Sequence, residues 1–246
     1  MEPKFKIPTE TVELPSKGWL YPAGHPLSSG TIEMKYMTAK EEDILTNTNY
    51  IKNGTVIDKL LQSLIVTEFE YGDLLVGDKN AIMVAARILS YGKDYEFEYA
   101  GGSRTVDLAT LEHKPFDESL YRRGENEFTF TLPHTENLIT FKLLSHRDER
   151  SIEQEVKGLQ KINKDTISEV TTRLKYMITS INGSREKKDI REFVDTALLA
   201  KDARALREEY TRVTPDINIT FTYEDSNGEE QEASIPIGLN FFWPDL

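Results

Sequence analysis

Hydrophobic residues recur along this chain at two different spacings, one typical of strands and the other typical of helices. Residues 95–99 and 218–223 alternate aromatic or β-branched residues with polar or small ones, as strands with one buried face do. Each run is followed by a tight loop that contains glycine and then by a return strand, which ends at Leu108 in one case and at Ile237 in the other. The pattern predicts two β-hairpins of the same shape.

Helical spacing dominates the region before the first hairpin. Helices are predicted to begin at Thr38 and at Thr55, because each threonine is followed three residues later by an acid, as in a capping box. A third helix is predicted over residues 78–92, with an apolar surface too broad for a partly exposed helix. We expect it to be the central core helix, in which Lys79 and Arg87 need solvent or a partner.

The composition changes after a second predicted strand pair at residues 127–132 and 138–143. Residues 145–213 are strongly charged and carry narrow apolar stripes, which suit antiparallel packing of three or four helices. The second of these helices is expected to run through Ile181 and to end at Asn182-Gly183. The chain is therefore expected to insert a helical subdomain between its two matched hairpins.

These elements predict an α+β fold, in which a helical core with paired β-hairpins carries an inserted helical subdomain. The N-terminal part is expected to be an extended, proline-rich segment that lies across the surface of something else. The helical core with its hairpins follows, then the helical insert, then a C-terminal hairpin with an aromatic tail that completes the core. The expected divisions are residues 1–37, 38–144, 145–215 and 216–246.

Paired hairpins of this shape form the skeleton of zinc ribbons, whose loops normally carry Cys-x-x-Cys motifs. The chain contains no cysteine. We therefore expect a degenerate, cysteine-free ribbon with neither metal nor cofactor, held together by side chains that pack across the pair of hairpins. These side chains are Phe97, Tyr99, Val106, Ile219, Phe221 and Ile235.

The charge balance narrows the classes of partner. The chain has 42 acidic and 30 basic residues, for a formal net charge of −12. Nucleic-acid binding that ignores base sequence needs a basic surface, so this class is disfavoured. No apolar run approaches the roughly 20 residues that cross a bilayer, and no apolar signal segment follows Met1. We expect no membrane span and a cytoplasmic protein.

Motifs for catalysis are weak. Neither a Gly-x-Ser-x-Gly elbow nor a complete phosphate-binding loop is present, and no histidine lies in a His-Glu-x-x-His motif. One alternative is an enzyme, such as a metal-independent hydrolase, with a cleft between the ribbon-like part and the helical block. Its best candidate residues are His113 and His134, with Glu112 or Glu136 nearby.

Several segments resemble one protein family: Leu-Pro-Ser-Lys-Gly at 14–18, Thr-Ala-Lys-Glu-Glu-Asp at 38–43, Ala-Ala-Arg-Ile-Leu-Ser-Tyr-Gly at 85–92 and Asn-Phe-Phe-Trp-Pro at 240–244. Together they resemble the baseplate hub family of T-even-like contractile-tailed phages, which includes the hub subunit and the hub assembly catalyst. Many members carry Cys-x-x-Cys in the two hairpin loops. This chain has residues 100–103 and 223–228 in those places, so no metal site is carried over.

The resemblance implies a non-enzymatic, late phage protein that promotes assembly of the central baseplate hub, as an assembly chaperone, or forms part of it. Expected partners are other hub or tail proteins and further copies of the chain. The expected location is the host cytoplasm during virion morphogenesis, and then the tail baseplate. Whether the protein stays in the finished particle is left open.

Large aromatic residues near both ends of the chain are the expected partner contacts. Three consecutive aromatic residues near a chain end are unusual, because chain ends are commonly polar and frayed. The alternative for each of these residues is packing within the chain itself. The expected contact or anchor residues are Lys17, Trp19, Tyr21, Phe241, Phe242 and Trp243.

Overall fold

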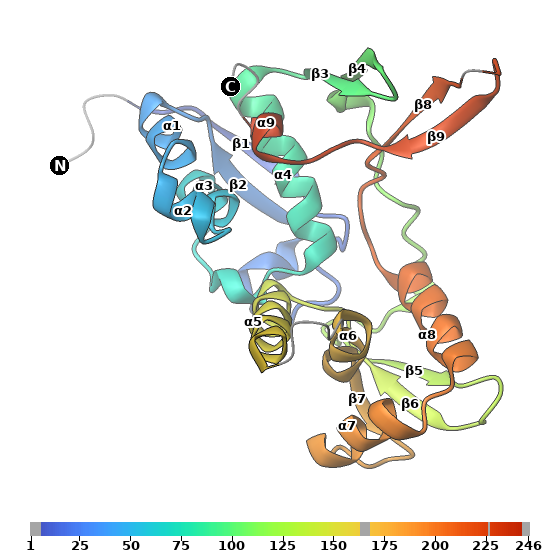
Figure 1. The fold of residues 1–246 in the computed structure, drawn as a ribbon. Coiled ribbons are helices and arrows are strands. Elements are labelled where there is room, and N and C mark those ends of the chain that lie inside the picture. Colours follow the sequence, from blue (N-terminus) through green and yellow to red (C-terminus); the bar gives the residue numbers. More distant parts are fainter. Residues whose placement is uncertain (1–5, 163–167, 226, 243–246) are drawn as a thin grey trace.

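The computed structural model describes residues 6–162, 168–225 and 227–242 (Figure 1). Helices and small antiparallel sheets alternate along this part of the chain, which confirms the α+β class. The α-helices are α1 (Ala39–Leu45), α2 (Thr48–Lys52), α3 (Val56–Leu64), α4 (Val76–Tyr91), α5 (His146–Ile162), α6 (Glu169–Met177), α7 (Lys187–Thr196), α8 (Ala200–Val213) and α9 (Leu239–Phe242). The strands are β1 (Thr9–Glu13), β2 (Thr31–Lys35), β3 (Asp94–Tyr99), β4 (Gly102–Asp107), β5 (Phe128–Thr131), β6 (Leu138–Phe141), β7 (Ile178–Ile181), β8 (Thr220–Glu224) and β9 (Glu230–Ser234). Short 3-10 helices are η1 (Pro26–Ser29), η2 (Tyr71–Asp73), η3 (Leu108–Thr110) and η4 (Glu118–Leu120).

The N-terminal segment folds onto its own chain. β1 pairs antiparallel with β2, from Thr9 opposite Lys35 to Glu13 opposite Thr31. Leu14 and Leu27, in the long loop between the strands, are buried in the core. This differs from the extended segment that was expected to lie across another surface. Its prolines shape a loop between two paired strands, and its leucines bury apolar area within the molecule.

Helix α4 is the predicted core helix, and it carries a buried charge near each end. Ile82 in its middle has no exposed surface, and the helix stops at Gly92, where φ is 84°. Asp78 lies in its first turn, where the helix dipole favours a negative charge. Near its other end, the Arg87 guanidinium donates to the carbonyls of Gly92 (2.7 Å) and Asp94 (3.1 Å). Arg87 thereby joins the end of α4 to β3.

The two predicted hairpins are present and pack against each other. β3 pairs with β4 and β8 pairs with β9, each in antiparallel register. The Phe221 ring lies edge-on to Phe97 and Tyr99, at centroid distances of 5.0 and 5.2 Å, and Tyr99 meets Tyr223 at 5.1 Å. Figure 1 shows the two hairpins near each other at one end of the molecule. The predicted packing across the pair is confirmed, and aromatic side chains occupy the contact.

One predicted helix of the insert ends early. α6 stops at Met177, and Ile178–Ile181 forms β7, which pairs antiparallel with β6 in the sheet β5-β6-β7. The prediction of helix through Ile181 is therefore wrong. The stretch is rich in β-branched residues, which favour strands, and pairing with β6 makes it a strand rather than the end of a helix. The sheet crosses the expected division at residue 144, although the four-part division as a whole stays a prediction.

The two expected capping boxes have different outcomes. At α1 the box is present: Glu41 Oε2 accepts the backbone N–H of Thr38 at 2.9 Å. At α3 the Thr55 side chain makes no capping hydrogen bond. Asp58, the acid of that predicted box, instead pairs with Lys79 Nζ at 2.6 Å and so joins α3 to α4. A long-range ion pair has taken the place of a local cap.

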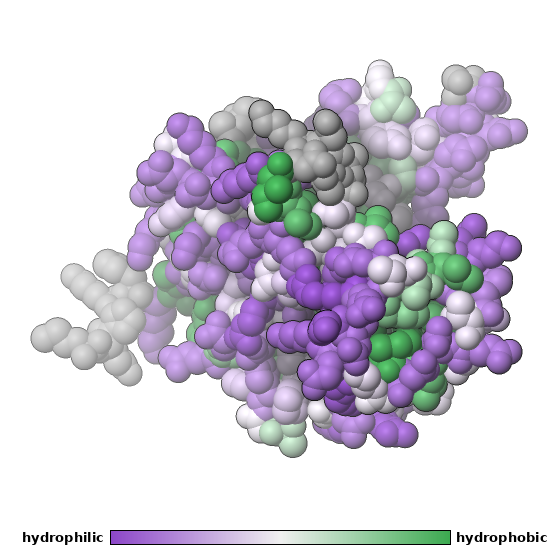
Figure 2. Space-filling model, turned by 60° about the horizontal axis from the view of Figure 1, so that its bottom comes forward, coloured by the Kyte–Doolittle hydropathy of each residue, from purple (hydrophilic) through white to green (hydrophobic). Residues whose placement is uncertain are grey.

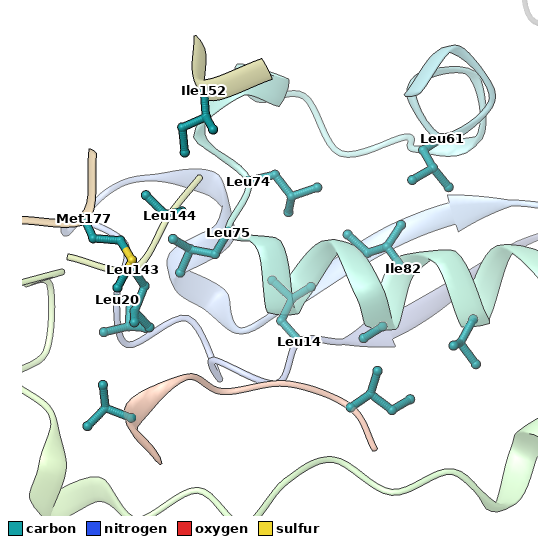
Figure 3. Packing of buried hydrophobic residues seen from close by; sticks show 14 of the residues in the cluster. Leu14, Leu20, Leu61, Leu74, Leu75, Ile82, Leu143, Leu144, Ile152 and Met177 are labelled. Carbon is teal, nitrogen blue, oxygen red and sulfur yellow. The ribbon is translucent and has the colours of Figure 1, made fainter. Parts of the chain in front are cut away.

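The core runs continuously through the molecule. Figure 3 shows Leu14 and Ile82 of α4 in the same group of buried side chains as Leu143, Leu144 and Met177. Helix α9 packs against α4 and closes the core from the other end of the chain. No helix within the described ranges is both long enough and apolar enough to cross a membrane.

Candidate protein-docking surface

The loop between β1 and β2 presents Lys17 at the surface, with Trp19 half-buried beside it. Lys17 has φ of 49°, and Gly18 has φ of 76°. A Cβ atom on Gly18 would lie 2.6 Å from the backbone N of Gly30 and from the carbonyl oxygen of Ser28. Only glycine allows both this backbone conformation and this close approach. The backbone at Gly18 therefore packs directly against the backbone of Ser28 and Gly30, and this close packing determines where Lys17 and Trp19 lie.

The buried carboxylate of Asp78 holds the same loop through hydrogen bonds. Asp78 is 1% exposed and accepts hydrogen bonds from the Ser16 backbone N–H (2.9 Å), the Ser16 hydroxyl (2.7 Å) and the Tyr21 hydroxyl (2.7 Å). The Tyr21 oxygen in turn accepts the Leu75 N–H at 3.1 Å. Burial raises the pKa of Asp78, while these hydrogen bonds favour its charged form. Ser16 and Tyr21 flank Lys17 and Trp19, so the hydrogen bonds to Asp78 fix both sides of the exposed turn.

Two residues from a distant segment complete the surface. Phe116 meets the Trp19 ring edge-on at a centroid distance of 5.9 Å, and Lys17 Nζ lies 5.2 Å from the centre of the Phe116 ring. The Arg123 guanidinium lies 5.7 Å from the centre of the Trp19 ring. These distances are within the range of cation–π attraction. The Gly124 N–H donates to the Trp19 carbonyl at 2.6 Å and ties the two segments together.

We call Lys17, Trp19, Phe116 and Arg123 the aromatic–cationic surface. Neither cation forms an ion pair with any residue in the described part of the chain, although the protein has a net charge of −12. Behind the surface, the Phe116 ring stacks on Tyr121 at 4.5 Å, so the aromatic layer rests on the core. Tryptophan and arginine are the residues most enriched among those that dominate binding energy in protein interfaces. The arrangement suits recognition of a partner that carries carboxylates.

Hydrophobic side chains elsewhere offer a less organised surface. Those with large exposed fractions come from several elements of the described chain: Ile7, Ile51, Val66, Leu138, Ile162, Val170 and Leu199. On the face shown in Figure 2, hydrophilic residues predominate and the hydrophobic residues form small separate patches. Single exposed hydrophobic residues are normal on soluble proteins and do not by themselves mark an interface.

Among the residues predicted to contact partners, three are buried inside the chain. Tyr21 donates a hydrogen bond to the buried Asp78 carboxylate. Phe241 and Phe242 of α9 are 0% and 1% exposed. The Phe241 ring lies 4.9 Å from that of Tyr95, edge-on. For these three residues the structure matches the intramolecular alternative, because the core takes up their rings. Trp243 lies outside the described residues, and only Lys17 and Trp19 face outward.

The histidines named for the enzyme alternative are held by separate partners. His113 forms a β-bridge with Ile217, and burial lowers its pKa. His134 Nδ1 lies 3.1 Å from Asp202 Oδ1, and its backbone N–H donates to the same carboxylate at 2.9 Å. In the described chain neither Glu112 nor Glu136 forms a hydrogen bond or an ion pair with either ring, and His134 pairs with Asp202, which was not predicted from the sequence.

A cavity of about 780 Å³ lies between α3 and α4 on one side and α5 and α6 on the other. Asp58 at its edge binds Lys79 (2.6 Å) and lies 3.6 Å from His146 Nε2. Burial lowers the pKa of His146, against the opposing effect of the Asp58 charge. The Asp58–Lys79 ion pair and the contact of Asp58 with His146 join three helices, α3, α4 and α5. Sequence reasoning missed this group, because its members come from three separate segments.

Comparison with known proteins identifies one family. The family model described as T4 bacteriophage base plate protein matches residues 8–243, nearly the whole chain. No curated protein and no solved structure matches the chain.

Proposed function

Because the chain belongs to the T4 bacteriophage base plate protein family, we propose that it acts in the central hub of the baseplate, as a hub component or as a factor that promotes hub assembly. Family membership makes it a baseplate protein of a phage tail, in contact with other tail proteins. The hub position and the assembly role are the proposal. Their support is the resemblance of the segments at 14–18, 38–43, 85–92 and 240–244 to hub proteins.

The aromatic–cationic surface is the contact that we assign to this function. It combines Lys17 and Trp19, on a loop fixed by Asp78, with Phe116 and Arg123 from a distant segment, and neither cation has an ion-pair partner in the described chain. Contact with a partner would desolvate these groups together, which is how a few residues come to dominate an interface. A role without catalysis agrees with the separate partners of His113 and His134.

Co-purification with individual hub and tail proteins tests the proposal. The double variant Lys17→Ala/Trp19→Ala is expected to lose partner capture, because it removes one cation and the central ring of the surface. The matched control is Lys187→Ala/Lys188→Ala, which changes two exposed lysines on α7 and should leave capture unchanged. Equal melting temperatures would show that neither variant is unfolded. Undiminished capture by the Lys17/Trp19 variant would contradict the assigned surface.

The stage at which the protein acts is a separate question. We propose that it works in the host cytoplasm, late in infection, before the tail is complete. Mass spectrometry of assembly intermediates and of finished tails from the same infection checks this. A chain present in intermediates and absent from finished tails would indicate an assembly factor, and equal amounts in both would indicate a structural hub component.

A further inference from the structure

The projecting β8–β9 hairpin carries a group of neighbouring acidic residues. The β8–β9 hairpin and its turn carry carboxylates at Glu224, Asp225, Glu229, Glu230 and Glu232, and all but Asp225 are exposed. None of the five forms an ion pair with a cation in the described part of the chain. In Figure 1 this hairpin, drawn in red, extends away from the body of the molecule. Its charges are therefore presented to whatever lies outside the molecule.

The hairpin is presented in a defined position. Along β8, Phe221 and Tyr223 pack on aromatic rings of β3. At its tip, Asp225 Oδ1 accepts the backbone N–H groups of Asn227 (2.8 Å) and Glu229 (3.0 Å). A hairpin anchored along one strand and closed at its tip loses little conformational entropy on binding. It is suited to insertion against a complementary surface.

The same chain carries the complementary charge on the aromatic–cationic surface. Lys17 and Arg123 lack ion-pair partners within the described residues, as the hairpin carboxylates do. Within one copy, no ion pair in the described residues joins the acidic hairpin to the aromatic–cationic surface, so their opposite charges are not paired with each other. They can pair between copies, and opposite charges brought together there guide association and fix its register.

We propose that the aromatic–cationic surface of one copy binds the acidic β8–β9 hairpin of a second copy. This deepens the proposed function, because it rests on the role of that surface in protein contacts and names its partner. The two surfaces in the contact are different, so the interface is heterologous, and each copy keeps a free surface and a free hairpin. Repetition of such a contact builds a ring where its rotation closes and a filament where it does not.

Charge reversal on each side provides the test, with self-association measured by sedimentation equilibrium. The wild-type chain should associate in about 0.05 M salt and dissociate in about 0.5 M salt, where exposed charges are screened. Lys17→Glu/Arg123→Glu and Glu229→Lys/Glu230→Lys should each weaken association at least about tenfold, because like charges then face each other. Lys187→Glu/Lys188→Glu, on α7, is the matched control and should keep wild-type association.

Mixing the two reversed variants gives the decisive result. In the mixture, two kinds of contact are possible, and each joins opposite charges. The acidic surface of the Lys17→Glu/Arg123→Glu variant faces the basic hairpin of the other variant. The unchanged basic surface of that other variant faces the unchanged acidic hairpin of the first, as in the wild type. Association should therefore return to within about threefold of the wild-type constant. Failure of the mixture to associate, although both variants melt like the wild type, would overturn the proposal.

The remaining outcomes are also decisive. A wild-type chain that stays monomeric at about 100 µM in low salt overturns the self-contact. If that monomer still captures another tail protein through Lys17 and Trp19, the proposed function stands and only the identity of the partner is wrong. If the chain associates but captures no hub or tail protein, the self-contact stands and the proposed hub role fails.

Discussion

The carboxylate of Glu41 should make the stability of this protein depend strongly on pH. Its side chain has no exposed surface and accepts four hydrogen bonds. Oε1 binds Lys35 Nζ (2.8 Å) and the Ser63 hydroxyl (2.8 Å), and Oε2 binds the Thr38 N–H (2.9 Å) and hydroxyl (2.6 Å). The perturbation is Glu41→Gln, which keeps the shape of the side chain and removes its charge.

The magnitude follows from the pKa of the group. Burial alone would raise the pKa of Glu41, but the hydrogen bonds from Lys35, Thr38 and Ser63 outweigh it and lower the pKa from 4.5 to about 2. One pH unit corresponds to about 1.4 kcal/mol, so the charged form contributes roughly 3 kcal/mol to the free energy of unfolding at neutral pH. The amide retains part of the hydrogen bonding, and we expect Glu41→Gln to cost about 2 to 3 kcal/mol at pH 7.

The sign of the pH dependence is determined as well. A carboxyl group with a lowered pKa in the folded state stabilises fully above the pKa of the unfolded chain. That stabilisation is lost as the pH falls from 4.5 toward 2. Urea denaturation followed by circular dichroism should therefore show the difference between wild type and Glu41→Gln shrinking steadily below pH 4.5.

The control is Asp43→Asn, an exposed acid in the same helix, which should change the free energy of unfolding by less than about 0.5 kcal/mol at every pH. An equal cost of Glu41→Gln at pH 7 and near pH 3, or a cost at pH 7 no larger than that of the control, would refute the reasoning. Either result would mean that the four hydrogen bonds do not favour the charged form.

Two further predictions concern packing. Phe221→Ala, or Phe97→Ala, should lower the free energy of unfolding by about 3 to 5 kcal/mol, because the two hairpins meet through these rings; a loss below about 1 kcal/mol in chemical denaturation would count against that contact. Gly18→Ala should cost at least about 3 kcal/mol, whereas Gly24→Ala should cost only about 1 kcal/mol. Both glycines have φ near 80°, but a Cβ on Gly18 meets backbone at 2.6 Å, whereas one on Gly24 meets no atom of the described residues within 4 Å. Equal melting temperatures for the two variants would contradict the close approach at Gly18.

Local signals in the sequence account for the elements that were predicted correctly. The helix α4 and its end at Gly92, the capping box of α1 and both matched hairpins depend on residues close together in the chain. The stretch Ile178–Ile181 shows where such signals stop. Its β-branched residues satisfy more than one conformation, and pairing with β6 decides between them.

The candidate site divides in the same way. Lys17 and Trp19 stand out in the sequence, because they belong to a turn-rich motif next to large aromatic residues. Phe116 and Arg123 do not, because the segment around them has no periodicity and lies far along the chain. Their place beside Trp19 follows from the contact between Gly124 and the Trp19 carbonyl, which only the folded chain creates.

The sequence by itself determined the α+β class, the cysteine-free hairpins, the acidic charge and the turn that carries Lys17 and Trp19. Tertiary structure alone decided that Tyr21, Phe241 and Phe242 face inward and that Asp78 is the buried hydrogen-bond partner of Ser16 and Tyr21. The physical reason is distance along the chain. Capping, glycine conformations and periodicity act between neighbouring residues, whereas burial and the pairing of charges depend on which distant segments the core brings together.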